Sequence, residues 1–428
     1  MFGSSQNEDA VLNSPFGRLG GVDSFVQKTR GDRVIWAIVV LLTLASLLLV
    51  YSSTGSLAYR MSKSTESYLF KQFAFIILGI LVIYWAHRIN YTLYSKVAKF
   101  LFLVSIPLLL YTLFFGVQLN AGSRWIKLPV INMTFQTSDL AKLALFMYMS
   151  RMLSRKQLVI KDFKKGFLPI IIPVAIICLL IAPANLSTAI LIGGTSILLM
   201  FIGRVSTKHI LGTIAVAAIP VALLFAVAVT NYDKEAGEAK KLPAIFSAGR
   251  IPTWVSRIQT FVYSKKEDDN EKMYQINQAK IAIANGGWVG RGPGNSQARN
   301  FLPHSYSDFI YAIIIEEYGL IGGAAIIFIY LLFLFRCIRI YRKCPFAFGA
   351  FLALALSFML VIQAVANMAV NVNLFPNTGV TLPLVSMGGS SFLFTCLSIG
   401  IILSVARNVE QQEGKPLSPK GELKTVVT

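Results

Sequence analysis

The chain has 428 residues, of which 55% are hydrophobic and only 14% are charged, and its mean hydropathy is +0.63. Soluble domains carry roughly 25% charged residues, so this composition excludes an ordinary soluble domain and predicts an all-α integral membrane protein. The net charge of +20 does not indicate nucleic-acid binding, because the basic residues lie at the ends of apolar runs rather than on one face.

Ten apolar runs predict about ten transmembrane helices. The fourth run is the weakest, because it is short and contains Asp139 and Lys142. The fifth and sixth runs are nearly continuous and meet at a hinge, Ala182-Pro183-Ala184-Asn185. Helices are expected because they satisfy their own backbone groups inside a bilayer. The predicted spans lie near 34–54, 67–87, 97–117, 138–153, 167–184, 186–203, 209–231, 308–335, 346–371 and 384–406.

Basic residues predict the orientation of these spans. With ten spans, the richest clusters of Lys and Arg fall on one side, which marks the cytoplasmic side. We therefore expect cytoplasmic, disordered tails at 1–33 and 407–428, flanking a membrane domain at 34–406. No cleavable signal peptide is visible, so the first span is expected to remain as an anchor. The clusters are Lys28, Arg30 and Arg33; Arg151, Arg155, Lys156, Lys161, Lys164 and Lys165; and Arg336, Arg339, Arg342 and Lys343.

The connection between the seventh and eighth spans, at about 232–307, is a large extracytoplasmic loop in this arrangement. Connections of this length are usually functional or disordered. Apolar residues recur at helical spacing within it, which is not typical of a linker, so we expect the loop to pack against the membrane domain. These apolar residues are Ile251, Trp254, Ile258, Phe261 and Val262.

The cysteines and histidines form no metal-site or disulfide pattern. The cysteines lie in or beside apolar runs without the spacing of a zinc site, and the histidines are scattered. They are Cys178, Cys337, Cys344 and Cys396, and His87, His209 and His304.

Charged residues inside apolar spans are costly and therefore candidates for function. Asp139 and Lys142 are three residues apart, on one helical face, and can neutralise each other. They either form a polar floor for an anionic substrate or a structural ion pair that fixes a short helix. The spacing alone does not decide between these interpretations.

Asp308 opens the eighth predicted span. It either caps the helix and complements its dipole, or it acts as a general base at the outer surface of the membrane. Glu316 and Glu317 follow, two turns deeper in a straight helix. Two adjacent acids in an apolar helix cannot both face lipid, so at least one is expected to face a polar interior or a partner.

Two glycine-rich stretches and one Arg-Trp pair complete the candidates. The segment 290–296 lacks the Lys-Ser/Thr ending of a phosphate-binding loop, and it predicts a tight turn on the outer side. The segment 386–391 contains Gly388 and Gly389, where small residues permit close helix packing, which we favour, or a backbone break. Arg124-Trp125 serves either as an interfacial anchor or as a phosphate contact.

Taken together, these motifs resemble the SEDS family (shape, elongation, division and sporulation), the RodA/FtsW polymerases of the bacterial cell wall. The resemblance extends over all ten spans and excludes only the tails. The outer-loop residues Gly294-Asn295-Ser296-Gln297 resemble the division member, FtsW, more than the elongation member, RodA. The other matching stretches are 120–126, 136–142, 302–303, 307–312, 316–319, 376–379 and 382–391.

The resemblance implies a glycosyltransferase that polymerises lipid II into a growing glycan strand on the outer face of the cytoplasmic membrane. It also implies a class B penicillin-binding protein and other division proteins as partners, and a place at the division septum. Asp308 matches the family's essential acid, which is proposed to deprotonate the acceptor sugar. The residues that then resemble substrate-cavity positions are Arg124, Trp125, Asp139, Lys142, Ser296, Gln297, Glu316, Glu317, Ser386, Gly388, Gly389 and Ser390.

The chain departs from the family pattern at three places. Tyr306-Ser307 replaces the usual His-Thr before the essential acid, and Gln136-Thr137-Ser138-Asp139 replaces Gln-Pro-Ser-Glu. Ala182-Pro183-Ala184 replaces Gln-Pro-Asp/Glu, so any role of that acid cannot be transferred to this chain.

The implied reaction releases a strongly anionic pyrophosphate, which needs stabilisation by cations or a metal. The candidate cations, in descending order, are Lys142, Arg124, Arg250, Arg257 and Lys280. A divalent cation such as Mg²⁺ or Mn²⁺ fits this chemistry, although the sequence has no evident cluster of oxygen ligands. The alternative functions are a lipid II flippase and a non-catalytic scaffold for the penicillin-binding protein; charges clustered in the outer half of the membrane favour the polymerase.

Overall fold

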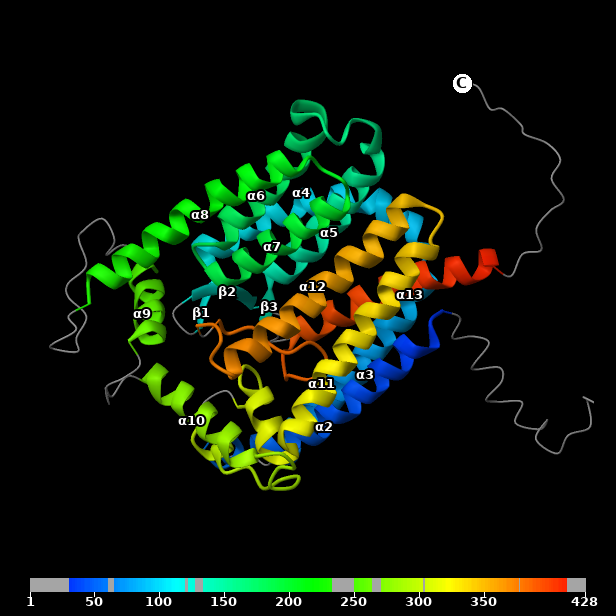
Figure 1. The fold of residues 1–428 in the computed structure, drawn as a ribbon. Coiled ribbons are helices and arrows are strands. Elements are labelled where there is room, and N and C mark those ends of the chain that lie inside the picture. The colour runs from blue at the N-terminus through cyan, green and yellow to red at the C-terminus, as the bar shows by residue number, and fades with distance from the viewer. Residues whose placement is uncertain are drawn as a thin grey trace, which may run out of the picture.

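Long apolar helices lie side by side in a computed structural model of the protein, which describes residues 31–60, 65–119, 122–127, 134–232, 250–263, 271–302, 305–376 and 378–413 (Figure 1). Residues 1–30 and 414–428 of the two predicted tails lie outside the described residues; the prediction of disorder is wrong for 407–413, which continue the last helix. The helices of the predicted spans are α2 (Arg33–Arg60), α3 (Thr65–Arg88), α4 (Tyr91–Phe115), α5 (Thr137–Arg155), α6 (Leu168–Ile181), α7 (Leu186–Ile202), α8 (Thr207–Thr230), α11 (Ile310–Lys343), α12 (Ala347–Asn371) and α13 (Ser390–Glu413).

Each predicted span overlaps one of these helices, and the predicted all-α membrane fold is confirmed. Eight helices in the described part of the chain are long and apolar enough to cross a bilayer; α7 is a shorter apolar helix, and α5, which carries the ion pair, is absent from both groups. Large apolar side chains on the outside of the bundle suit contact with lipid, as at Leu48, Phe114 and Leu179, which are 65%, 74% and 72% exposed.

Three predicted ends fall short, since α2, α11 and α13 extend to Arg60, Lys343 and Glu413, and two predicted starts are wrong for local reasons. The third span starts at Tyr91 rather than 97, because the Asn90 side chain accepts a hydrogen bond from the Thr92 N–H and caps the helix there. The last helix starts at Ser390 rather than 384, because the preceding segment forms turns and Leu384 adopts a positive φ of 63°.

A small antiparallel sheet positions the start of α5. Its strands are β1 (Val117–Leu119), β2 (Gly122–Lys127) and β3 (Thr134–Gln136), in the order β1-β2-β3, with Trp125 paired to Gln136. Because β3 runs directly into α5, this pairing holds the first turn of the helix that contains Asp139.

The loop between α8 and α11 contains two further helices, α9 (Ile251–Val262) and α10 (Glu271–Gly286), together with the short turn η4 (Ala298–Asn300). The predicted helical spacing in α9 is confirmed. Val255 packs against the end of α8, and the Gln259 side chain donates hydrogen bonds to the Ala228 and Asn231 carbonyls. The loop therefore packs against the membrane domain, as predicted, in the part that the structure describes.

The helix α11 folds back on itself at Gly319, where φ is 70° and ψ is −174° (Figure 1). The Tyr311 hydroxyl donates to the Gly323 carbonyl at 3.3 Å, although these residues would lie about 18 Å apart along a straight helix. Residues 310–318 therefore form a re-entrant segment that packs against residues 320–343. The prediction that Glu316 and Glu317 lie deeper than Asp308 is wrong, because the chain reverses after them.

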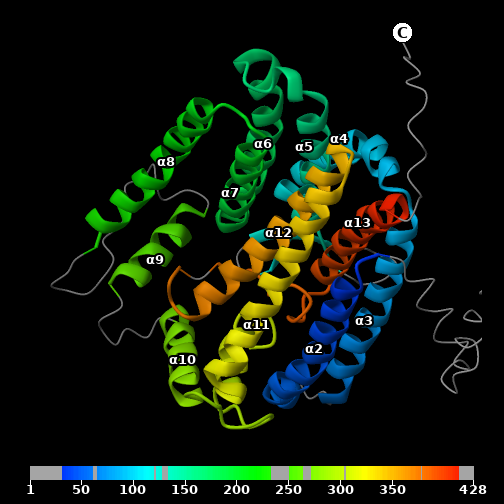
Figure 2. The same ribbon diagram turned by 45° about the vertical axis from the view of Figure 1, so that its right-hand side comes forward.

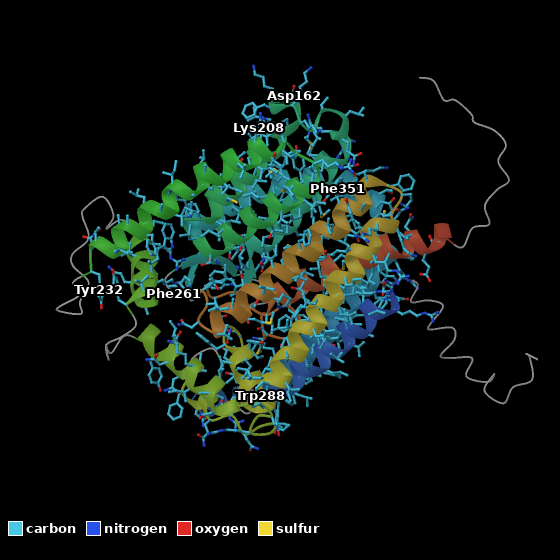
Figure 3. All side chains as sticks on the ribbon, in the orientation of Figure 1. Asp162, Lys208, Tyr232, Phe261, Trp288 and Phe351 are labelled. Carbon is cyan, nitrogen blue, oxygen red and sulfur yellow. The ribbon has the colours of Figure 1, made fainter. Side chains whose placement is uncertain are left out.

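The two ends of the membrane domain meet on one side of the molecule. The Gly31 N–H donates to the Glu410 carboxylate at 2.8 Å, which joins the start of α2 to the end of α13. Asp32 forms an ion pair with Arg336 of α11 at 2.6 Å. Asp162 and Lys208 lie at one end of the molecule, and Trp288 lies at the opposite end (Figure 3).

Candidate functional site

Asp308 lies inside the bundle, immediately before the re-entrant segment. The N-cap position of that helix is Phe309, so the prediction that Asp308 opens and caps a straight span is wrong. The Ser307 hydroxyl donates to the Asp308 carboxylate at 3.2 Å. Two side chains of α12, Asn367 and Asn371, each donate to the Asp308 backbone carbonyl at 2.9 Å. The acid is therefore attached to the most enclosed part of the molecule.

The segment between α12 and α13 lies against Asp308. A Cβ atom at Gly379 would lie 3.5 Å from the Asp308 carboxylate. The Ser386 hydroxyl donates to the Ser307 carbonyl at 2.6 Å, and the Met387 N–H donates to the Tyr306 carbonyl at 3.1 Å. Ser386 thus fixes the chain on both sides of the site, which gives this predicted residue a positioning contact.

The segment also reaches the middle of the bundle. The Ser46 hydroxyl, in α2, donates to the Val385 carbonyl at 2.7 Å, and the Tyr330 hydroxyl, in α11, donates to the Pro383 carbonyl at 2.5 Å. Ser46 and Tyr330 lie well inside their helices, so this segment enters the bundle, and the half-buried Asp308 lies beside it.

Gly388 and Gly389 break the backbone before α13. Both precede the first residue of the helix, and Gly389 adopts a positive φ of 54° with no atom close to its Cβ position. The favoured prediction that these glycines pack helices closely is wrong, and the alternative of a backbone break is confirmed. Ser390, which begins α13, accepts a hydrogen bond from the Gln136 N–H at 3.2 Å and so joins α13 to the sheet.

Asp139 and Lys142 form the predicted ion pair, with 2.8 Å between the Lys142 ammonium and the Asp139 carboxylate. Asp139 is buried, and its second carboxylate oxygen has no hydrogen-bond partner. Lys142 also donates to the Gln363 side chain at 3.2 Å, and Gln363 donates to the Thr381 carbonyl at 3.0 Å. Lys142 is therefore connected to the segment that packs against Asp308.

A hollow beside Lys142 opens between α5, α7 and α12. Its walls combine polar and apolar side chains. The lining residues are Lys142, Phe146, Thr188, Leu191, Ile192, Thr195, Met359, Gln363 and Val380.

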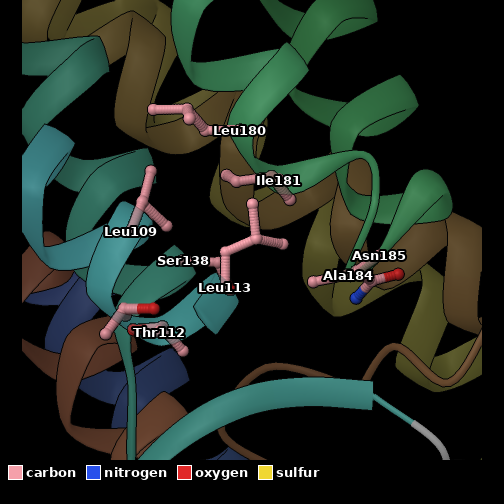
Figure 4. A pocket seen from close by; sticks show the side chains of 9 residues that line it. Leu109, Thr112, Leu113, Ser138, Leu180, Ile181, Ala184 and Asn185 are labelled. Carbon is pink, nitrogen blue, oxygen red and sulfur yellow. The ribbon is translucent and has the colours of Figure 1, made fainter. Parts of the chain in front are cut away.

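A second hollow lies near the first turn of α5 (Figure 4). It is apolar toward α4 and α6 and polar toward the starts of α5 and α7. Arg250 of α9 lies next to it, because its guanidinium donates to the Ala184 carbonyl. The lining residues are Leu109, Thr112, Leu113, Thr137, Ser138, Leu180, Ile181, Ala184 and Asn185.

Arg250 and Arg257 place two positive charges near the site. Burial lowers the pKa of the Arg250 guanidinium, whose buried Nε has no hydrogen-bond partner. Burial also lowers the pKa of Arg257, and the positive charge of Arg250 lowers it further. The negative charge of Asp308 raises the pKa of Arg257 and so opposes both effects. These opposing effects place Arg257 within electrostatic reach of both Arg250 and Asp308.

Glu316 and Glu317 lie at the fold-back end of the re-entrant segment, where both are buried. Glu316 accepts hydrogen bonds from the Ser296 hydroxyl and from the backbone N–H groups of Gln297 and Ala298. Glu317 accepts a hydrogen bond from the Ser52 hydroxyl of α2. The expectation that at least one acid faces a polar interior is confirmed for both. Contact of Glu316, Glu317, Ser296 and Gln297 with substrate stays a prediction.

The remaining predicted residues are not joined to Asp308 by a described contact. Lys280 is an exposed residue of α10. Trp125 is half-buried in β2, whereas the side chain of Arg124 and the residue His304 lie outside the described part. Among the described residues, no three or more His, Cys, Asp or Glu side chains gather as a metal site requires.

Three site residues, Gln363, Asn367 and Asn371, were not predicted. They are spaced four residues apart in the apolar helix α12, which places them on one face, and they contact Lys142, Asp308 and the segment after α12. A repeat of polar amides at this spacing in an apolar run is a signal that the sequence does contain.

Comparisons with known proteins agree with this architecture. The FtsW/RodA/SpoVE family profile, described as cell cycle protein, matches residues 32–411. The chain is 33% identical over 385 residues to the probable peptidoglycan glycosyltransferase FtsW of Geobacter metallireducens, across 89% of this chain and 96% of that protein. It is 30% identical over 389 residues to stage V sporulation protein E of Bacillus subtilis, across 89% and 98% of the two chains.

A solved structure shares the fold. A chain from a peptidoglycan synthase complex that coordinates polymerization and crosslinking aligns with a TM-score of 0.67 and 22% identity, across 89% of this chain and 99% of that chain. The profile match over most of the sequence, the curated relatives and the shared fold establish that this multi-pass membrane protein belongs to the FtsW/RodA/SpoVE family of cell cycle proteins.

Proposed function

We propose that this protein is a peptidoglycan glycosyltransferase that polymerises lipid II into glycan strands during cell division. The names of its relatives support this activity, including an FtsW of Geobacter metallireducens with 33% identity. The observation that carries the assignment to a site is the placement of Asp308, an acid held inside the bundle by two amides of α12, with Arg257 within electrostatic reach.

In the proposed reaction, Asp308 acts as the general base. Its carboxylate accepts the proton of the acceptor sugar's hydroxyl as that oxygen attacks the anomeric carbon of the donor. The new glycosidic bond forms as the bond from the anomeric carbon to the donor's pyrophosphate oxygen breaks. The lipid-linked pyrophosphate leaves with the bonding electrons, and the proton later passes from Asp308 to water.

Cationic side chains stabilise the leaving pyrophosphate in this proposal. Lys142 faces one hollow beside α5, and Arg250 lies next to the other. Each hollow is lined on one side by apolar side chains. Lys142, Arg250 and Arg257 are supported by these placements, whereas Arg124 and Lys280 rest on the sequence alone.

A divalent cation stays a prediction. The described residues do not bring together three or more His, Cys, Asp or Glu side chains, so they do not fit a cation held by protein ligands alone. We derive no step through a metal. Polymerisation measured with a chelator and with added Mg²⁺ or Mn²⁺ tests whether the reaction needs one.

The proposal places the protein beside a cross-linking partner at the septum. The structural relative comes from a complex that coordinates polymerization and crosslinking, which supports a class B penicillin-binding protein as partner. We propose that the α9–α10 side faces outward and that both termini are cytoplasmic, where the tails can meet other division proteins.

Purified protein with labelled lipid II tests the activity and the site together. Wild type is expected to form glycan chains, whereas Asp308→Asn and Asp308→Ala are expected to form none while folding and binding the partner normally. Asp162→Asn, at the opposite end of the molecule, is the matched control and is expected to be active. Polymerisation by a folded Asp308→Ala protein refutes the catalytic role; lipid II translocation without polymerisation by wild type supports a flippase.

A further inference from the structure

Three buried amide side chains form a row along α12. Gln363, Asn367 and Asn371 are spaced one helical turn apart and are 7%, 1% and 1% exposed. Burial of an amide is costly unless its groups are hydrogen-bonded. In this row every amide side chain forms a hydrogen bond with the backbone of another segment. The row therefore joins α12 to the two segments that form the site, residues 308–312 and 380–381.

Asn371 caps the re-entrant segment from outside that helix. The first N–H groups of a helix have no partner within it, and the N-cap residue Phe309 has no side-chain oxygen to supply one. The Asn371 side-chain oxygen accepts the Ala312 N–H at 3.1 Å and shares it with the Phe309 carbonyl, also at 3.1 Å. Its nitrogen donates to the Asp308 carbonyl at 2.9 Å. One side chain therefore holds both the first helical turn and the residue that precedes it.

Asn367 also holds the backbone segment that faces Asp308, which follows α12. Its nitrogen donates to the Asp308 carbonyl at 2.9 Å and to the Val380 carbonyl at 2.7 Å. Val380 follows Gly379, whose Cβ position lies 3.5 Å from the Asp308 carboxylate. The same amide thus sets the distance between the acid and the backbone that faces it. Asn371 in turn donates to the Asn367 backbone carbonyl at 2.8 Å and to the Asn367 side-chain oxygen at 3.4 Å, and the second contact couples the two amides.

We infer that Asn367 and Asn371 are positioning residues that orient the Asp308 carboxylate for proton transfer. The inference rests on the proposed function, because it gives the two amides a role only through Asp308. Both amides bind the Asp308 backbone carbonyl rather than its carboxylate. A displacement of about 1 Å at a reacting group can cost about 100-fold in rate, so loss of either amide is expected to act on turnover.

The test compares full-length Asn371→Ala, Asn371→Asp and Asn367→Ala with wild type in polymerisation of labelled lipid II. Each variant is expected to lose about 10- to 100-fold in kcat with KM for lipid II changed less than about twofold. Asn371→Asp is informative because it keeps the acceptor for the Ala312 N–H but loses the donor to Asp308. It is therefore expected to lose kcat although the helix remains capped.

A matched control separates positioning from stability. The Ser404 hydroxyl, at the other end of α13, also donates to a backbone carbonyl, that of Ile89 at 2.5 Å. Ser404→Ala is expected to lower Tm without changing kcat. If Asn371→Ala does not accumulate as folded protein, Asn371→Ser and Asn367→Ser take its place in the same assay.

The outcomes are distinguishable. Wild-type kcat in folded Asn367 and Asn371 variants, or a rise in KM at unchanged kcat, overturns the inference and leaves the proposed function intact. Polymerisation by a folded Asp308→Asn protein overturns the proposed function itself. A fall in kcat at constant KM in the Asn variants, together with an inactive Asp308→Asn, supports both.

Discussion

At the scale of single residues, the buried ion pair between Asp139 and Lys142 has a structural role, and we propose a role in catalysis for Lys142. Asp139 is 3% exposed, so its charge depends on Lys142 for compensation. Replacing one partner of a buried pair leaves an unpaired charge, which costs about 3–5 kcal/mol. Lys142→Met is therefore expected to lower Tm strongly and to abolish polymerisation, with thermal unfolding in detergent and lipid II turnover as the measurements.

The double variant Asp139→Leu with Lys142→Met separates the two roles. Removing both charges is expected to recover most of the lost stability, since a buried pair adds little over apolar residues of similar size. Activity is not expected to return, because the ammonium group is still missing. Recovery of polymerisation in the double variant would show that the pair is structural only.

Residue chemistry was predictable where the sequence carries a distinctive pattern. Asp308 was found through the motifs around it, and the Asp139–Lys142 pair through its spacing of three. The amides Asn367 and Asn371 were missed because an Asn in an apolar helix can meet many partners. Their partners here, the Asp308 and Val380 carbonyls, come from segments that only the fold brings together.

At the scale of elements, the fold-back of α11 was beyond prediction from the sequence. Apolar residues lie on both sides of Glu316, Glu317 and Gly319 and together have the length of one span, so a straight span was the natural expectation. The reversal depends on backbone contacts with a distant loop: the Arg291 N–H donates to the Glu316 carbonyl at 3.0 Å, and the Leu320 N–H donates to the Gly287 carbonyl at 2.9 Å. Hydropathy records none of these contacts, whereas the other helix positions follow from it.

Gly319→Ala tests the fold-back. A Cβ atom at Gly319 would overlap the Trp288 carbonyl, and the positive φ of 70° is itself strained for alanine. The variant is expected to lose at least about 2 kcal/mol of stability and most of its activity. Gly287→Ala is the control for the strain of a positive φ without a close contact. The φ of Gly287 is 52° and its Cβ position is open, so a loss of about 1 kcal/mol of stability is expected. Equal losses of Tm in the two variants would contradict the close contact.

Glu316 is expected to hold the loop around η4 against α11. Glu316→Ala leaves the buried Ser296 hydroxyl and two N–H groups without their acceptor, at about 1–3 kcal/mol for each buried group. Trypsin cleavage at Arg291 and Arg299 is expected to accelerate. Glu317→Gln, which keeps an acceptor for the Ser52 hydroxyl, is the control and is expected to change cleavage little. Faster cleavage in Glu317→Gln but not in Glu316→Ala would show that Glu317, and not Glu316, holds this loop.

At the scale of the whole molecule, the start of α2 and the end of α13 are joined, so both ends of the membrane domain lie on one side. This side also carries the end of α11 with Arg336, bound to Asp32. Short loops rich in Lys and Arg face the cytoplasm, and the segment after α5 contains Lys161, Lys164 and Lys165. The long loop with α9 and α10 is attached at the other end of the helices, next to the fold-back of α11.

Cysteine labelling in intact cells tests this orientation. Trp288 and Leu158 are 75% and 102% exposed and belong to the two opposite ends, so cysteine at either position is accessible to a thiol reagent. Trp288→Cys is expected to react with a membrane-impermeant maleimide in intact cells, and Leu158→Cys only after permeabilisation. The native cysteines provide a low background, since Cys337 and Cys396 are buried and Cys178 and Cys344 are partly so. Labelling of Leu158→Cys from outside would place the α9–α10 side in the cytoplasm, away from the site of cell-wall synthesis, and Asp308 could then not serve as the base for an external sugar.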